Sequence, residues 1–176
     1  DGWHDDELLN LIFDTFQCRT YYTKTQHGYH LYYYKQPRQR VKTKDGIGVL
    51  GFKVEHKTSA NSPNGVCEKR NGIANQIVDY PMAFFPEIFK ILPNATLDLL
   101  HMGEGNRDNS LFTHSRGVLN LGLEKDLVLE ILNFINQHIF SEPLDDILKF
   151  VDTDKRLEKS KENINDKAKQ FMTKYN

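Results

Sequence analysis

A histidine at the head of a tyrosine run is the first candidate for chemistry. His30 stands in "TQHGYHLYYY", residues 25–34, two positions after Gly28. Because side chains alternate along a strand, His30, Tyr32 and Tyr34 are expected to share one face. Gly28 would let another group approach the backbone closely. Two interpretations stay open: a structural histidine of a strand, or a side chain that binds an anionic ligand.

A run of positive charge follows this segment directly. The stretch "KQPRQRVKTK", residues 35–44, holds five cations and no acid before Asp45; the cations are Lys35, Arg38, Arg40, Lys42 and Lys44. The formal net charge of the whole chain is −1, so this is a local strip on a balanced protein. Such a strip is expected to follow the phosphates of a nucleic acid, with the neighbouring tyrosines as stacking surfaces for bases. The alternative is a solvated loop.

Carboxylates are the third requirement for nucleotide chemistry. Metal-assisted nucleotidyl transfer needs acidic side chains that hold divalent ions, here Mg²⁺ or Mn²⁺. The candidates are Asp1 and Glu55, the latter on the polar face of a predicted strand. A glutamate on a strand often simply faces water, so the metal site is a hypothesis.

Other familiar site patterns are not found. Residues 103–112, "GEGNRDNSLF", open a predicted helix but lack the Gly-Lys-Ser/Thr of a phosphate-binding loop. The seven histidines have no paired spacing of the kind that zinc sites use. No apolar run approaches the ~20 residues that span a bilayer, so we expect no membrane partner. The two cysteines, Cys18 and Cys67, are too few for a disulfide framework, so a reducing, cytoplasmic setting is expected. The first residue is Asp rather than Met, which suggests a fragment of a longer protein.

The elements that must position these side chains are predicted from periodicity. Residues 1–92 are expected to be α+β: a helix over 6–17, strands over 19–25, 27–35 and 47–57, a hairpin around Asn71-Gly72, and a short helix after Pro86. Residues 93–103 are interpreted as a linker. Residues 104–153 are predicted to form three helices. The first ends near Gly122, the second has apolar positions between 128 and 139, and the third begins after Ser141 and buries Leu144, Ile147, Leu148 and Val151. The charged residues 154–176 are predicted to be a solvated tail or linker.

The helical half also resembles a known family. Gly105, Arg107, Asn109, Leu111 and Phe112, followed by Gly122-Leu123 and by Pro143-Leu144, resemble the small helical domain that follows the catalytic domain in primase-polymerases of phages, plasmids and other mobile elements. Upstream, "TKTQHGYHLYYYKQP" resembles the second motif of the archaeo-eukaryotic primase superfamily, and "LGFKVEHKTSANSPNG" its third. "DGW" at the start is similar to the end of the first motif, Asp-x-Asp followed by Gly. The fold class implied is α+β: the C-terminal part of a primase-polymerase catalytic domain, followed by a small three-helix domain.

The resemblance implies roles for individual residues. His30 would contact the triphosphate of the incoming nucleotide, with Lys24 and Lys53 as further nucleotide contacts. Asp1 and Glu55 would be catalytic and would hold the metal, although the family's acid usually stands where this sequence has Lys53. Arg107 and Arg116 would join the basic strip in gripping the template. The activity implied is DNA primase or polymerase, acting on nucleoside triphosphates and single-stranded DNA, with a replicative helicase domain or protein as a further partner.

Two alternatives remain. Lys53 in the expected acid's place favours a catalytically degenerate relative that only binds DNA as a replication-initiation module of a mobile element. The other alternative is an α+β domain unrelated to nucleic acids, whose basic loop is merely solvated. DNA affinity that does not fall as salt rises would point to this last interpretation.

Overall fold

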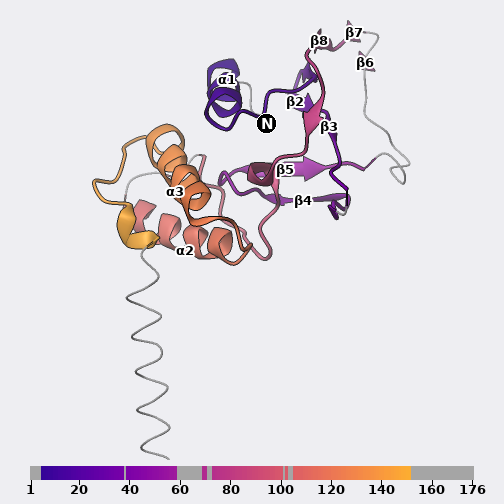
Figure 1. Cartoon of the computed structure of the whole chain (residues 1–176). Coiled ribbons are helices and arrows are strands. Elements are labelled where there is room, and N and C mark those ends of the chain that lie inside the picture. The colour runs from indigo at the N-terminus through magenta and orange to yellow at the C-terminus, as the bar shows by residue number, and fades with distance from the viewer. Residues whose placement is uncertain are drawn as a thin grey trace, which may run out of the picture. The chain divides into compact units, whose positions relative to one another are not determined.

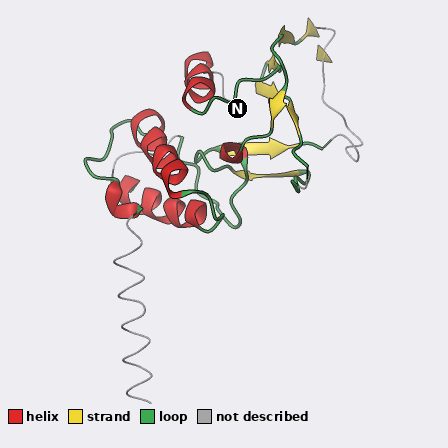
Figure 2. Cartoon of the chain, viewed as in Figure 1, coloured by secondary structure: helices red, strands yellow, loops and turns green. Residues whose placement is uncertain are grey.

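The computed structural model describes residues 5–37, 39–58, 69–70, 73–100, 102 and 105–151. This part of the chain is of the mixed α+β class. The chain divides into two compact units, Asp1–Met102 and Gly103–Asn176. The described strands belong to the first unit, and the helices α2 (Arg107–Leu119) and α3 (Lys125–Phe134) belong to the second (Figures 1 and 2). None of the helices in the described ranges is both long enough and apolar enough to cross a membrane.

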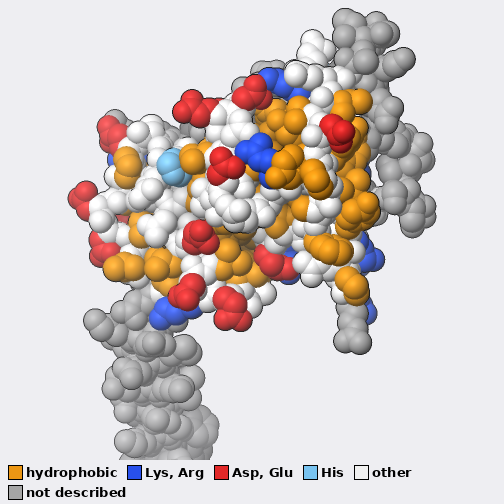
Figure 3. All heavy atoms as spheres, turned by 45° about the horizontal axis from the view of Figure 1, so that its top comes forward, with side chains coloured by type: hydrophobic (Ala, Val, Ile, Leu, Met, Phe, Trp, Pro, Cys, Tyr) orange, Lys and Arg blue, Asp and Glu red, His pale blue; other side chains and the backbone are white. Residues whose placement is uncertain are grey.

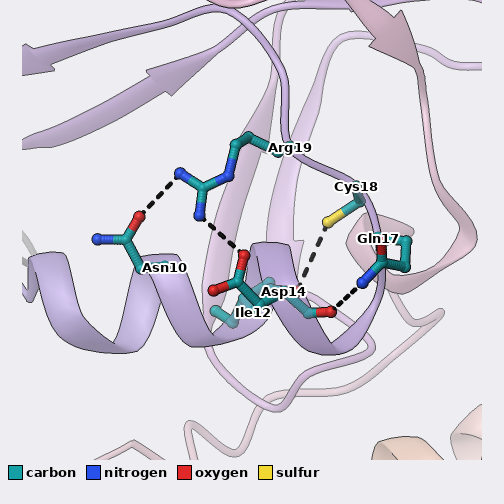
Figure 4. Close-up of polar contacts among 6 residues, drawn as sticks. All are labelled: Asn10, Ile12, Asp14, Gln17, Cys18 and Arg19. Atoms are coloured by element: carbon teal, nitrogen blue, oxygen red, sulfur yellow. Dashed lines mark hydrogen bonds and ion pairs between the residues drawn. The ribbon is translucent and has the colours of Figure 1, made fainter.

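Helix α1 (Asp6–Thr15) confirms the first predicted helix, two residues shorter at its end. The Asp5 carboxylate accepts from the Leu8 N–H at 2.9 Å and caps the helix. The chain that leaves α1 is held back against it, because Arg19 donates to Asn10 Oδ1 and to Asp14 Oδ1, each at 2.9 Å (Figure 4). The apolar stripe Leu8, Leu9, Ile12 and Phe13 is buried.

A three-stranded antiparallel sheet carries His30. Its order is β2 (Gly28–Leu31), β1 (Tyr22–Thr25), β8 (Gln76–Val78). Helix α1 covers one face, where the Phe13 and Tyr22 ring centroids lie 5.7 Å apart. Thr23 lies opposite both His30 and Ile77 in the register. Because Thr23 is the next residue after Tyr22, these three side chains project from the face away from α1.

The predicted strand over 27–35 is interrupted at Tyr32. Beyond it, β3 (Tyr33–Tyr34) pairs in parallel with β9 (Ala83–Phe84) instead of with β1. The Tyr33 hydroxyl donates to the Cys18 carbonyl at 2.8 Å, which turns Tyr33 inward. Its neighbour Tyr34 points outward and is 56% exposed.

The single strand expected over 47–57 is wrong. The chain there forms a hairpin of β4 (Lys44–Ile47) and β5 (Lys53–His56), joined by residues 48–52. Gly51 has a φ of +86°, and a Cβ there would lie 2.7 Å from Leu99 Cδ1. Val49, Leu50 and Phe52 are buried in this turn, so an apolar run that looks like strand is in fact a covered reversal of the chain.

The segment predicted to be a linker packs on the first unit. Leu99 is fully buried, and its N–H donates to the Gly51 carbonyl at 2.7 Å. Residues 93–100 therefore close over the hairpin turn, and the unit extends to Met102.

Two shorter predictions agree better with the structure. Strands β6 (Lys69–Arg70) and β7 (Ile73–Ala74) form the expected hairpin, although Asn71-Gly72 themselves lie outside the described residues, and Pro86 precedes a single 3₁₀ turn, η1 (Glu87–Phe89).

The second unit has two of the three predicted helices. Helices α2 and α3 bury Leu111, Val118, Val128, Ile131 and Leu132 completely, and α3 continues as a π-helical turn, η2 (Ile135–Ile139).

The prediction of a third helix is wrong: only a 3₁₀ turn, η3 (Leu148–Phe150), forms there, and Leu148 is 62% exposed. The buried Asn136 amide explains this. It accepts from the Leu144 N–H at 2.7 Å and donates to the Leu144 carbonyl at 2.9 Å, and a helix would need this carbonyl for its own first hydrogen bonds.

Candidate functional site

His30 and Thr23 form a polar pair on the sheet face away from α1. Their Cα atoms are partners across β1 and β2. Two buried atoms, His30 Nδ1 and Thr23 Oγ1, have no hydrogen-bond partner among the residues that the structure describes. Buried polar atoms are nearly always paired, since leaving them unpaired costs free energy. Both atoms are therefore exceptions to the usual pairing of buried polar groups.

The charges around His30 come from the end of β5. Burial lowers the pKa of His30 below its ordinary value of 6.5, and the positive charge of Lys57 lowers this pKa further, while the Glu55 carboxylate acts in the opposite direction. His30 is thus held largely neutral at pH 7, with one ring nitrogen able to donate and the other to accept. These effects show that Glu55 and Lys57 lie within electrostatic range of the imidazole. The relation between His30 and Glu55 is this electrostatic one, and no hydrogen bond or ion pair joins them in the part of the chain that the structure describes.

Glu55 has an acidic neighbour that the sequence analysis missed. Asp45 lies directly opposite Glu55 in the β4–β5 register, so both carboxylates project from one face of the hairpin. Lys57 Nζ is 3.4 Å from Glu55 Oε2, and Lys53 Nζ is 3.6 Å from Asp45 Oδ2. We call Asp45, Lys53, Glu55 and Lys57 the carboxylate face. Asp45 was interpreted only as the end of the basic strip, because the hairpin that pairs it with Glu55 was not predicted.

The carboxylate face fits part of a metal site. Mg²⁺ is commonly held by one or two carboxylates together with substrate phosphates, and Asp45 and Glu55 offer two on adjacent strands. Within the described ranges, no group of three or more His, Cys, Asp or Glu residues could hold a metal. Asp1, the other predicted metal ligand, lies outside the described residues. Binding of Mg²⁺ or Mn²⁺ by Asp1 and Glu55 therefore stays a prediction, and the strand register adds Asp45 as a neighbouring carboxylate.

Lys24 is not brought to His30. It lies on β1 next to Thr23, so it projects from the opposite face of the sheet, toward α1. There it forms an ion pair with Asp6, whose other carboxylate oxygen accepts from the Tyr29 hydroxyl at 2.6 Å. This contact ties the sheet to the first turn of α1.

The basic strip leads to a hollow on the first unit. A volume of about 250 Å³ is bounded by three of the predicted cations, Arg40, Lys42 and Lys44, and also by Lys90 and His56. Its remaining lining residues are Gln39, Val41, Phe85 and Ile91. We call this the basic hollow. Lys35 is exposed but does not line it, and Arg38 lies outside the described residues.

The hairpin separates the basic hollow from the carboxylate face. Lys44 lies opposite His56 in the register, and each is the neighbour in sequence of a carboxylate-face residue, Asp45 and Glu55. Because side chains alternate along a strand, Lys44 and His56 project from the other face of the hairpin. Lys90 and His56 were not predicted, because no local pattern connects them to the strip.

Two aromatic side chains of the first unit pair with each other and are exposed. Tyr34 and Phe84, partners across β3 and β9, have ring centroids 6.2 Å apart and are 56% and 59% exposed. Figure 3 shows hydrophobic side chains gathered on part of the molecular surface. Tyr34 and Phe84 agree with the expected stacking surface for bases, although only one of the tyrosines in the run is so exposed.

The two predicted arginines of the second unit differ. Arg107 pairs with the Glu142 carboxylate at 3.1 Å, donates to the Glu142 carbonyl, and has a side chain only 15% exposed. Arg116 is exposed, with its guanidinium 5.4 Å from the Phe112 ring centroid. Arg107 therefore holds the start of α2 to the segment before Pro143, whereas Arg116 can reach a ligand.

Comparison with known proteins adds no family to this description. The chain matches none of the family models, curated proteins or solved structures with which it was compared. The primase-superfamily assignment therefore stays a prediction from the motifs. The case for a function depends on the residues themselves.

Proposed function

We propose that this chain is part of a primase-polymerase, which transfers a nucleotide from a nucleoside triphosphate to the 3′-hydroxyl of a nucleotide or primer on single-stranded DNA. The observation that carries the proposal is the grouping of His30 with Glu55 and Lys57, where a half-buried histidine lies within range of both a carboxylate and a cation. This is the combination of groups that the chemistry needs. The motif resemblance in the sequence supports the same assignment.

Each side chain would have a distinct task. His30, largely neutral before the nucleotide binds, takes up a proton as it donates a hydrogen bond to a phosphate oxygen, and Lys57 and Lys53 balance the negative charge of the triphosphate. Asp45 and Glu55, with Asp1, would hold Mg²⁺ or Mn²⁺, which when bound neutralises phosphate charge and activates the attacking hydroxyl. In such an in-line displacement, positioning and electrostatic stabilisation supply most of the rate.

The decisive test is primer synthesis by the longest natural form of the protein. His30→Gln should remove most product while single-stranded DNA binding persists, because glutamine can donate a hydrogen bond but cannot take up a proton as phosphate binds. Products at the wild-type level from His30→Gln would refute the role of this residue. Arg116→Gln serves to separate template binding from nucleotide binding, since it lies in the other unit.

A second candidate is a DNA-binding replication-initiation module without catalysis. The observation that favours it is the pairing of both carboxylates with lysines, Asp45 with Lys53 and Glu55 with Lys57. A metal would have to compete with these ammonium groups. Tight, salt-dependent DNA binding with no nucleotide incorporation in Mg²⁺ or Mn²⁺ would favour this candidate. In either case a replicative helicase domain or protein is the expected partner.

A further inference from the structure

The basic hollow is distinct from the grouping around His30, and we propose that it is a second phosphate site, which holds internal backbone phosphates of a single-stranded nucleic acid. The inference rests on the nucleic-acid partner of the proposed function, but not on catalysis. It adds Lys90 and His56 to the predicted strip and leaves Lys35 out. The hairpin β4–β5 would then separate the strand from the incoming nucleotide.

Uncompensated charge is the first argument. Arg40, Lys42 and Lys44 have no ion pair among the described residues, and no acid lines the hollow. Lys90 alone has a partner, Glu87, one helical turn away. On the carboxylate face, in contrast, both lysines lie beside an acid. Several converging cations without counter-charge favour an anion, and phosphate accepts hydrogen bonds from both lysine and arginine.

The size and rigidity of the hollow are the second argument. Its volume of about 250 Å³ is smaller than the roughly 300–1,000 Å³ of sites that enclose a whole small molecule, so phosphates would enter while bases stay outside. The His56 ring is fixed by two contacts. Its Nε2 lies 2.7 Å from the Phe89 carbonyl, and its ring meets Phe85 edge-on at 5.2 Å. A nitrogen that faces a carbonyl must carry the proton, so the ring orientation is set before any ligand binds.

The test measures binding of a 5′-hydroxyl single-stranded oligonucleotide by fluorescence anisotropy at several salt concentrations. The variants are Lys42→Gln, Lys44→Gln and the double variant, with Lys125→Gln as the control. Lys125→Gln makes the same change of charge at an exposed position in the other unit. The double variant should bind roughly tenfold more weakly, since two solvent-exposed ion pairs with phosphate are lost, each worth about threefold. The slope of log K against log salt should fall by about 0.7 for each lost contact, or about 1.4 in total. Lys125→Gln should change neither.

Three results would overturn the inference. The first is a double variant that binds with the wild-type affinity and salt slope while remaining folded by circular dichroism. The second is a gain in affinity from a 5′-phosphate that the wild type shows and the double variant does not. This result would assign the hollow to a terminal phosphate. The third is inorganic phosphate that competes as well as an equal concentration of oligonucleotide phosphate, which would make it a free-anion site.

Failure of the proposed function would look different. A wild-type protein that makes no primer in any metal, but whose DNA binding depends on Lys42 and Lys44 as described, refutes the polymerase proposal and supports the hollow. A protein that makes primers and binds DNA independently of both lysines does the reverse. The two ideas are therefore tested separately by one set of variants.

Discussion

On one face of the β4–β5 hairpin each lysine lies beside an acid, whereas on the other face the cations have no acid among the residues that line the basic hollow. The two faces are built from consecutive residues. Lys44 and Asp45 are neighbours on β4, and Glu55 and His56 are neighbours on β5, yet the alternation of side chains sends one of each pair to each face. Chemistry that depends on carboxylates and binding that depends on positive charge can therefore be placed on one hairpin, separated only by its thickness.

The largest effect should come from the carboxylate face. Glu55→Gln keeps the shape of the side chain but removes its charge, and we expect nucleotide incorporation to fall at least about 100-fold, because metal-held charge contributes several kcal/mol. Single-stranded DNA affinity should not change, while Lys44→Gln on the other face should show the opposite pattern. Primer-extension rates and anisotropy titrations measure the two. Glu130→Gln, an exposed acid of α3, is the control. Equal losses of activity and binding in Glu55→Gln would show that the faces are not separate.

The next largest effect is expected on the free energy of unfolding, from a substitution in the hairpin turn. Gly51→Ala combines a φ of +86° with a Cβ placed 2.7 Å from Leu99 Cδ1, so we expect a loss of about 2–4 kcal/mol in the free energy of unfolding. Gly122→Ala is the matched control. It also has a positive φ, +71°, but a Cβ there meets nothing within 4 Å, and about 1 kcal/mol is expected. Urea unfolding measures both. Equal losses would mean that Leu99 does not press on the turn, and the assignment of residues to the two faces would lose support.

A smaller effect is expected from the exposed aromatic pair. Tyr34→Ala should weaken single-stranded DNA binding roughly fivefold, because stacking of a base on an aromatic ring is worth about 1 kcal/mol or more. Tyr34→Phe should retain the affinity, since the ring remains. The salt slope should stay as in the wild type for both variants, which distinguishes stacking from the phosphate contacts of the basic hollow. If Tyr34→Phe is as weak as Tyr34→Ala, the hydroxyl and not the ring makes the contact.

The smallest effect is a pH dependence of the free energy of unfolding that comes from His30. The folded-state pKa of His30 lies below 6.5, so the unfolded chain takes up a proton that the folded chain does not. The contribution of His30 to the free energy of unfolding is complete above about pH 6.5 and is lost as the pH falls from there through the folded-state pKa. Unfolding free energies at about pH 7.5 and about pH 5.5 should therefore differ less for His30→Gln than for the wild type. A greater loss of stability at low pH in His30→Gln than in the wild type would contradict this direction.

Binding of a phosphate should reverse the effect on the same residue. An anion beside the imidazole favours its protonated form, so nucleotide affinity should rise as the pH falls toward 6. His30→Gln should flatten this rise, and His56→Gln should not. The comparison of the two variants in a nucleotide titration indicates which face receives the incoming nucleotide.

The sequence alone was enough for elements whose signals are local. The acidic start and apolar spacing of residues 6–15 specify α1, the spacing of Leu111 and Val118 and of Val128, Ile131 and Leu132 specifies α2 and α3, and Asn71-Gly72 marks a hairpin. The cations of residues 35–44 were equally visible as a group. In each case the deciding interactions lie within a few residues along the chain, so periodicity and turn chemistry record them directly.

What the tertiary structure decided was pairing across distance. Residues 48–52 have the apolar pattern of a strand, but they form a turn that is covered by Leu99, a residue far along the chain. Residues 144–151 have the apolar spacing of a helix, but the Asn136 amide binds the Leu144 carbonyl that such a helix would use. The same holds for the site: Asp45 becomes a partner of Glu55, Lys90 joins the basic hollow, and Lys24 turns to Asp6 only once the strands are in register. A shift of one residue would exchange the two faces of the hairpin, and no local pattern in the sequence records that register.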